Sequence, residues 1–113
     1  MSNVRTLLGF GLLLAGAGVG LSAQQPDGTS LYRENCRTCH GAAGKPTQRA
    51  LSQYPKIPTM DPAFFAVRSA DSIIAILTHG KGKDMKSFTA KLTPAEMRAV
   101  AEYIRSTFGS PKP

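Results

Sequence analysis

Apolar residues in the second half of this chain recur every three or four positions, which is the spacing of one face of an α-helix. No stretch alternates between apolar and polar residues, as a half-buried β-strand does. The pattern therefore predicts an all-α protein of about four short helices, joined by loops rich in glycine, proline and lysine.

The last helix, expected over residues 93–108, has the strongest signals. Thr93-Pro94-Ala95-Glu96 is a capping box with proline at the first helical position, and Leu92 and Met97 stand where a hydrophobic staple forms. Gly109 follows the last turn and predicts its end. One apolar stripe runs along the segment: Met97, Val100, Ala101, Ile104 and Phe108.

Three shorter helices are expected before it. The first covers residues 29–35, the second covers residues 61–67 after an Asp-Pro start, and the third covers residues 69–79 before a glycine. Residues 41–60 and 81–91 have neither helical nor strand periodicity. These two segments are expected to be loops.

The N-terminal segment has the composition of a secretory signal. Arg5 supplies a positive charge, and residues 7–21 are an uncharged stretch rich in Leu, Gly and Ala. We expect residues 1–23 to be a signal peptide for export to the periplasm and residues 24–113 to form one domain. An uncleaved membrane anchor is the alternative, because residues 6–26 carry no charge, but five glycines and a polar end argue against a span.

The most informative short motif is Cys36-Arg37-Thr38-Cys39-His40. Cys-x-x-Cys-His is the attachment sequence of c-type haem. Two thiols one helical turn apart can add across the two vinyl groups of the porphyrin, and the next imidazole reaches the iron as proximal ligand. Cys36 and Cys39 are thus the predicted attachment residues, and His40 is the predicted ligand, of one covalently bound haem c.

Three other uses of the motif are weaker. A disulfide between Cys36 and Cys39 would close a very small loop, for which the gain in chain entropy is small. A thioredoxin-like redox pair belongs in a βαβ unit, whereas the sequence after Cys39 is polar and contains proline. A zinc site needs four ligands, and adjacent Cys39 and His40 fit one tetrahedral centre poorly.

Size and charge indicate what kind of partner the domain has and how it is stabilised. The 113-residue chain has 14 Lys and Arg against 7 Asp and Glu, and removal of Arg5 with the signal leaves 13 against 7, a net charge of +6 for residues 24–113. This charge favours an acidic partner or a membrane surface. A domain of this size buries only about 60–65% of its unfolded surface, so a covalent cofactor would add needed stability.

With these motifs, the chain resembles the class I monohaem cytochromes c. Three segments carry the resemblance: Gly28-x-x-Leu31-Tyr32-x-x-x-Cys36-x-x-Cys39-His40-Gly41, Gly80-Lys81-Gly82-x-x-Met85-x-x-Phe88, and Leu92-Thr93-x-x-Glu96 leading to Tyr103-Ile104. The resemblance implies the class I cytochrome c fold, with about four short helices wrapped around one covalent haem. In that family the first and last helices cross, and the methionine loop covers the haem face opposite the histidine.

The resemblance also makes Met85 the expected sixth ligand of the iron. Met85 lies in a glycine-rich loop between two helices, from which a thioether can reach the metal. Met60, which precedes a helix start, is the competing candidate, whereas Met1 belongs to the leader and Met97 to the apolar stripe. His79 ends a helix, where an imidazole interacts favourably with the helix dipole, and is not expected to bind iron.

The ring of His40 needs a partner for its second nitrogen. A backbone carbonyl of the loop after the motif is the expected acceptor, and Pro58 or Pro55 is the candidate. Such a bond would fix the orientation of the ring and raise the basicity of the nitrogen that binds iron.

The methionine loop differs at one position from that of the class I cytochromes c that the chain resembles. Those proteins commonly carry proline after the ligand methionine, and this chain has Lys86 there. The change removes a residue that would restrict the loop backbone and adds a side chain that could compete with Met85 for the iron. Four lysines would surround the exposed haem edge if the family geometry holds: Lys81, Lys83, Lys86 and Lys91. They form either a docking surface for an acidic partner or a solvated loop.

The sequence thus predicts an exported electron carrier that cycles between ferric and ferrous iron and is not an enzyme, because His40 and Met85 close both axial positions. A cytochrome subunit of a dehydrogenase or terminal oxidase is one alternative. A haem enzyme or gas sensor with a labile sixth ligand is another, for which Lys86 is the only hint. The expected partners are redox proteins and not nucleic acids. Membrane contact is expected only through an uncleaved N-terminus. The chain alone is expected to be a monomer.

Overall fold

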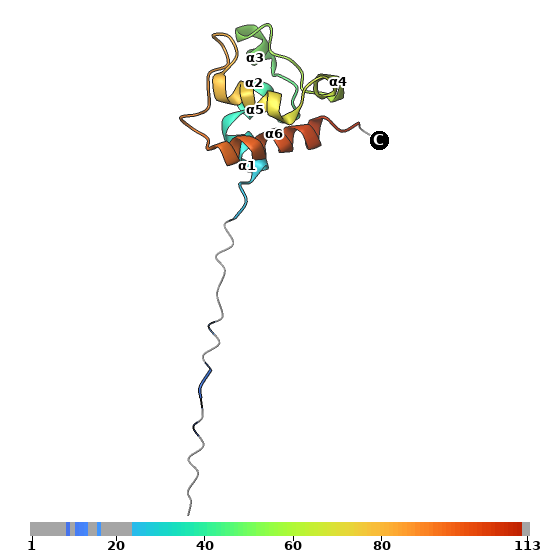
Figure 1. Cartoon of the computed structure of the whole chain (residues 1–113). Helices are drawn as coiled ribbons and strands as arrows, with labels where there is room; N and C mark the ends of the chain where they lie inside the picture. Colours follow the sequence, from blue (N-terminus) through green and yellow to red (C-terminus); the bar gives the residue numbers. More distant parts are fainter. Residues whose placement is uncertain (1–8, 10, 14–15, 17–23, 112–113) are drawn as a thin grey trace, which may run out of the picture.

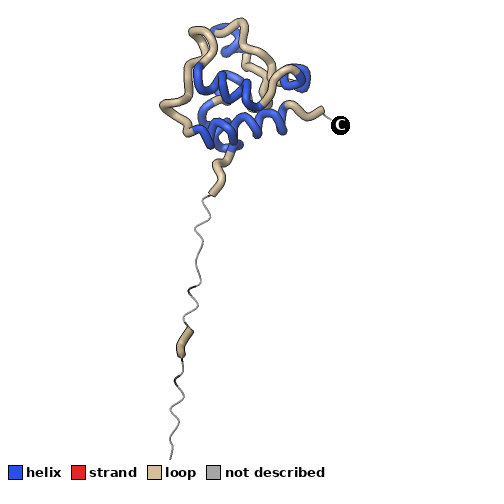
Figure 2. Tube along the Cα trace, viewed as in Figure 1, coloured by secondary structure: helices blue, strands red, loops and turns tan. Residues whose placement is uncertain are grey.

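The structure, a computed structural model, describes residues 9, 11–13, 16 and 24–111. These residues contain helices and no β-strand, apart from one isolated bridge between Lys81 and Met85, so the prediction of an all-α protein is confirmed (Figure 1, Figure 2). The helices are α1 (Gly28–Asn35), α2 (Arg37–His40), α3 (Gln48–Gln53), α4 (Pro62–Ala66), α5 (Ala70–His79) and α6 (Pro94–Phe108).

The four helices predicted from the sequence are α1, α4, α5 and α6, and each begins at a side chain that accepts a hydrogen bond from the first turn. Asp27 accepts from the amide of Thr29 at the start of α1. At α6 both halves of the capping box form: Thr93 Oγ1 accepts from the amide of Glu96 at 3.2 Å, and the Glu96 carboxylate accepts from the amide of Thr93 at 2.9 Å. Local side-chain chemistry therefore determines where these helices begin.

Two short helices were not predicted. The expected loop over residues 41–60 contains α3, which begins where Thr47 Oγ1 accepts from the amide of Ala50 at 3.1 Å. Only one residue of α3, Ala50, is buried, so this short segment has too few apolar positions to show a helical period. The haem motif forms α2, a separate turn after a break in the backbone at Cys36, rather than the end of α1.

The core lies where α1 packs across α6 (Figure 1). A Cβ atom on Gly28 would lie 2.4 Å from the carbonyl oxygen of Ala99, so only glycine permits this approach of the two helices. Tyr32 of α1 packs against Tyr103 and Phe108 of α6, with ring centroids 5.5 and 5.3 Å apart. On the other side of α6, α5 supplies further buried side chains.

The predicted signal peptide, residues 1–23, lies almost entirely outside the described residues. In the part of the chain that the structure describes, no helix has the length and apolar character needed to span a membrane.

Candidate functional site

A cavity of about 610 Å³ opens into the helical domain. Cys36, Cys39, His40 and Met85, the four residues predicted from the sequence, all line this cavity, and so does Met60. The fold therefore brings the haem motif of α2 and the methionine loop, about 45 positions later in the sequence, to one space. Helices α4, α5 and α6 add only apolar side chains to the lining: Phe64, Ile73, Ile76, Leu77, Val100 and Ile104.

His40 lies on α2 as a half-buried, neutral imidazole. Its Nδ1 atom is buried without a hydrogen-bond partner, and burial lowers the pKa of the ring. The predicted bond from this ring to the carbonyl of Pro58 or Pro55 is absent, although Pro58 lines the same cavity as His40. A neutral imidazole facing a cavity fits the donor that haem iron requires.

Both cysteines are free thiols, so the disulfide alternative is not realised in this structure. Burial raises the pKa of the Cys36 thiol to about 11, with a smaller contribution from Cys39. Catalytic redox dithiols instead carry a cysteine of lowered pKa that is largely thiolate at neutral pH. The environment of Cys36 thus argues against a thioredoxin-like pair, and both thiols lie in the cavity as thioether attachment requires.

The position of His40 is supported by the residue after it. Gly41 adopts φ +80, and a Cβ atom there would lie 1.9 Å from the carbonyl oxygen of Lys45, so the turn that ends α2 requires glycine. The buried hydroxyl of Tyr32 donates to the Gly41 carbonyl at 2.6 Å. Tyr32 belongs to the first of the three sequence motifs, but nothing local in the sequence indicates its bond to Gly41.

The methionine loop is held as a tight turn between α5 and α6. The amide of Lys81 donates to the carbonyl of Met85 at 2.7 Å, and the amide of Met85 donates back at 3.3 Å. Gly80 adopts φ +75, where a Cβ atom would lie 2.7 Å from the Met85 carbonyl oxygen. Ser87 Oγ donates to the carbonyl of Thr78 at 2.7 Å, which ties the loop to α5. These bonds constrain the loop although Lys86 replaces the usual proline.

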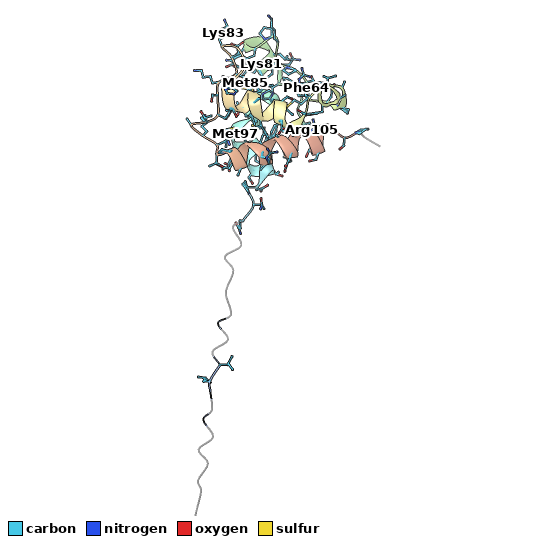
Figure 3. All side chains as sticks on the ribbon, in the orientation of Figure 1. Phe64, Lys81, Lys83, Met85, Met97 and Arg105 are labelled. Atoms are coloured by element: carbon cyan, nitrogen blue, oxygen red, sulfur yellow. The ribbon has the colours of Figure 1, made fainter. Side chains whose placement is uncertain are left out.

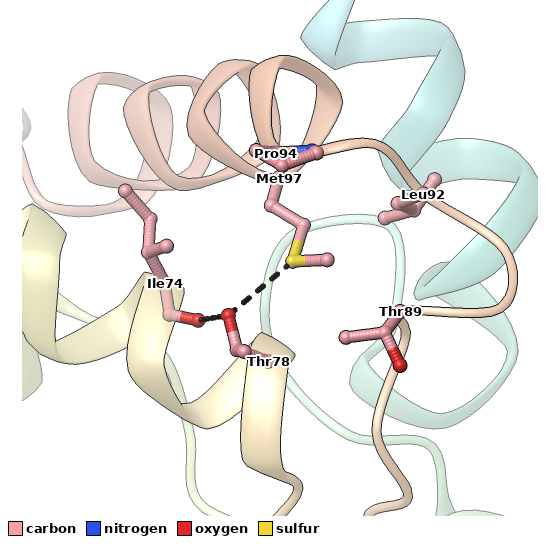
Figure 4. Close-up of a pocket in the computed structure, with 6 residues that line it drawn as sticks. All are labelled: Ile74, Thr78, Thr89, Leu92, Pro94 and Met97. Atoms are coloured by element: carbon pink, nitrogen blue, oxygen red, sulfur yellow. Dashed lines mark hydrogen bonds between the residues drawn. The ribbon is translucent and has the colours of Figure 1, made fainter.

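Two methionines of the described chain line the cavity, and a third does not. Met60 is 6% exposed, and Met85 is partly buried. Met97 lies in the α5–α6 contact, where its sulfur is 3.6 Å from the hydroxyl oxygen of Thr78 beside a separate pocket of about 220 Å³ (Figure 4). The assignment of Met97 to packing is confirmed, and Met60 remains the competitor of Met85.

Basic side chains surround the mouth of the cavity. Of the four predicted lysines, Lys81, Lys83 and Lys86 are exposed and line it, and Figure 3 shows the first two beside Met85, whereas Lys91 is exposed but does not line it. His79 also lies outside the lining, as expected. Five other polar residues of the lining were not singled out from the sequence: Asn35, Tyr54, Lys56, Arg68 and Asp84.

A small all-α domain with a Cys-x-x-Cys-His helix and a methionine loop on one apolar cavity defines the class of c-type cytochromes. Residues 23–104 match the family described as Cytochrome C oxidase, cbb3-type, subunit III, and the chain belongs to this cytochrome c family.

Similar proteins of known name agree with this assignment. The chain is 33% identical over 99 residues to cytochrome c6 of Nostoc sp., covering 87% of this chain and 85% of that protein. It is 27% identical over 96 residues to the cbb3-type cytochrome c oxidase subunit FixP of Azorhizobium caulinodans, covering 85% of this chain but 31% of FixP. Among solved structures, the KustC0563 c-type cytochrome superposes with a TM-score of 0.65 at 32% identity, covering 73% of this chain and 98% of that one. The chain is therefore a small monohaem c-type cytochrome with covalently bound haem c, and its function is electron transfer.

Proposed function

We propose that this protein is an exported one-electron carrier that shuttles between separate redox proteins. In this proposal Cys36 and Cys39 hold the haem through thioether bonds, and His40 and Met85 are the two axial ligands. The observation that carries it is the meeting of these four side chains on one apolar cavity.

Each residue has a defined task in such a carrier. Bound haem c supplies the ferric/ferrous couple. His40 stays neutral because burial lowers its pKa, so its ring offers a lone pair at neutral pH. The apolar lining excludes water and disfavours the more highly charged oxidised centre.

Two observations favour Met85 over Met60 as the second axial ligand. Met60 is tied through its amide to Gly44, in the segment that directly follows His40. Met85 comes from a separate loop, and the hydrogen bonds at Gly80 and Lys81 hold that loop against the cavity. A loop independent of the histidine segment is the better source of a ligand for the other face of the iron.

The exposed lysines at the cavity mouth suggest the nature of the partner. Lys81, Lys83 and Lys86 stand where an electron would enter or leave, and they repel basic surfaces while attracting acidic ones. We infer that the electron donor and acceptor present acidic patches to this mouth.

A subunit of an oxidase complex is the second candidate, favoured by the matches to the cbb3-type family and to FixP. The two roles are distinguished by isolation of the native protein from membranes and from the soluble fraction. A carrier is recovered as a free small protein, whereas a subunit stays with the haem proteins of its complex through detergent extraction and size-exclusion chromatography.

Haem extraction, mass measurement and absorption spectra test the proposed haem attachment and axial ligation. Extraction with acid and organic solvent should leave the haem on the protein, and mature mass should include one haem. The absorption spectrum of the ferrous protein should not change under carbon monoxide, because both axial positions are filled. Release of free haem would overturn the attachment, and rapid binding of carbon monoxide would favour a haem enzyme or gas sensor with an open sixth position.

A further inference from the structure

Ser87, two residues after Met85, attaches the methionine loop to α5 through its side chain. Its Oγ donates to the carbonyl of Thr78 at 2.7 Å and lies 2.9 Å from the hydroxyl oxygen of Thr89. The amide of Thr89 also donates to Ser87 Oγ, at 3.2 Å. Between residues 80 and 91, all of which the structure describes, no other side chain makes a hydrogen bond to α5. One hydroxyl therefore connects the loop to the last turn of α5 and to the chain that leads to α6.

The bond of Ser87 lies at a place where a helix needs donors. The last carbonyls of a helix have no partner within the helix, and at α5 the end of the methionine loop supplies two donors for them. The amide of Phe88 donates to the carbonyl of Leu77 at 2.8 Å, and the hydroxyl of Ser87 donates to the next carbonyl, that of Thr78. Residues 87 and 88 thus complete the end of α5 together.

The hydrogen bonds nearer to the ligand close the loop only on itself. The amide of Lys81 donates to the carbonyl of Met85, and the amide of Met85 donates back to Lys81. These two bonds shape the turn but do not tie it to α5. Lys86, which separates Met85 from Ser87, lacks the fixed φ angle that proline would give the backbone at this point. The position of the turn over the cavity therefore depends on the bonds made directly after it.

We propose that Ser87 is a positioning residue for Met85: its bond to the carbonyl of Thr78 keeps the methionine loop closed over the cavity and so holds the thioether on the iron. This inference rests on the proposed role of Met85 as axial ligand, and it adds a side chain that controls how often the ligand is released. One hydroxyl–carbonyl bond shifts an equilibrium severalfold. Ser87 therefore governs the fraction of molecules with an open loop, whereas the helical core holds the fold.

An added ligand measures how often the loop opens. Imidazole binds the ferric haem when Met85 leaves the iron, so its apparent dissociation constant is the intrinsic constant divided by the fraction of protein with an open loop. Ser87→Ala removes the donor to Thr78 and raises this fraction. The apparent dissociation constant of imidazole should fall by about 3- to 10-fold in titrations of the ferric holoprotein. Ser87→Thr keeps a hydroxyl and should bind imidazole as the wild type does.

Thr78→Val is the matched control. It removes a hydroxyl that donates to the carbonyl of Ile74 at 2.8 Å, but it leaves the backbone carbonyl that Ser87 contacts. Its effect on the free energy of unfolding, measured by denaturant titration, should not be accompanied by tighter binding of imidazole. This comparison separates release of Met85 from a general loss of stability.

Amide hydrogen exchange reports the same opening without an added ligand. The amide of Phe88 is bonded to the carbonyl of Leu77, beside the bond of Ser87, and should exchange about 3- to 10-fold faster in Ser87→Ala. The amide of Met97 donates to the carbonyl of Thr93 at 2.9 Å, at the start of α6. It should exchange at the wild-type rate.

An unchanged affinity for imidazole in Ser87→Ala, with or without faster exchange at Phe88, overturns the positioning role. Equally tight binding in Ser87→Ala and Thr78→Val also overturns it, because a general loss of stability would then account for the release of Met85. Two other results would overturn the proposed axial ligation instead: absence of the methionine absorption band from the wild-type ferric protein, or survival of that band in Met85→Ala.

Discussion

The hydroxyl of Tyr32 donates a 2.6 Å hydrogen bond to the backbone carbonyl of Gly41, the residue directly after His40. Tyr32 is 3% exposed and packs edge-on against Phe108, so α1, α6 and the end of the haem motif meet at one side chain. The bond fixes the backbone from which the His40 ring projects. The crossing of the terminal helices is thereby linked to the geometry of the haem site.

Replacement of this hydroxyl should destabilise the fold. Tyr32→Phe keeps the ring but leaves the buried Gly41 carbonyl without a donor, so we expect the free energy of unfolding to fall by about 1–3 kcal/mol. Denaturant titration followed by circular dichroism measures this loss. Tyr103→Phe removes a hydroxyl for which no hydrogen bond is found in the described structure, and it should cost less than Tyr32→Phe.

The same residue predicts how stability changes at alkaline pH. Burial raises the pKa of Tyr32 well above its usual value of about 10, so above that pH the unfolded chain loses a proton that the folded chain keeps. Stability from this group is therefore complete below about pH 10 and is lost as pH rises toward the folded pKa. The advantage of wild type over Tyr32→Phe should narrow above pH 10 in parallel unfolding titrations, and a gap that widens would contradict this assignment.

The conformation of Gly80 should control the methionine loop. At φ +75 and ψ 177 this backbone is accessible almost only to glycine, and the Cβ atom of an alanine would lie 2.7 Å from the Met85 carbonyl oxygen. Gly80→Ala should weaken the loop by about 1–3 kcal/mol and reduce the absorption band of methionine-ligated ferric haem. Gly82→Ala is the control, because Gly82 also has positive φ but no atom within 4 Å of the added methyl group. Equal losses in both variants would show that contact with Met85 is unimportant.

Removal of the thioether tests the axial ligand directly. Met85→Ala should abolish the band of methionine ligation, open the site to carbon monoxide and lower the reduction potential if a stronger donor takes the place of sulfur. Met60→Leu, a change of similar volume in the same cavity, should leave the band intact. The reverse pattern would make Met60 the ligand.

The lysines at the cavity mouth should govern association with an acidic partner. Lys83→Glu and Lys86→Glu should slow electron exchange with the partner while leaving the haem spectrum unchanged. The wild-type rate should fall steeply as the salt concentration rises, because exposed charges are screened over about 8 Å at physiological ionic strength. Lys91→Glu makes the same change in charge outside the cavity lining and should slow exchange less. Stopped-flow kinetics at several salt concentrations measure these rates, and a rate insensitive to salt would assign the lysines to solubility alone.

The sequence by itself determined the features that depend on near neighbours. The capping box at Thr93 and Glu96 forms as predicted, because a side chain and an amide three positions apart meet at a helix start. The haem motif is equally local, since its spacing is a property of one helical turn. The positions of α1, α4, α5 and α6, the all-α class and the candidate attachment residues could therefore be predicted without tertiary contacts.

Only the tertiary structure decided what depends on residues distant in sequence. It placed both Met60 and Met85 on the cavity, formed α3 inside an expected loop, and left Nδ1 of His40 without the predicted carbonyl. The side chain of Arg105 donates a hydrogen bond to the backbone carbonyl of Arg68, 37 positions earlier in the sequence, and neither local sequence predicts this bond. Such contacts depend on how the helices pack around the cavity. The packing of α1 and α5 on α6 determines which residues from distant parts of the sequence meet there.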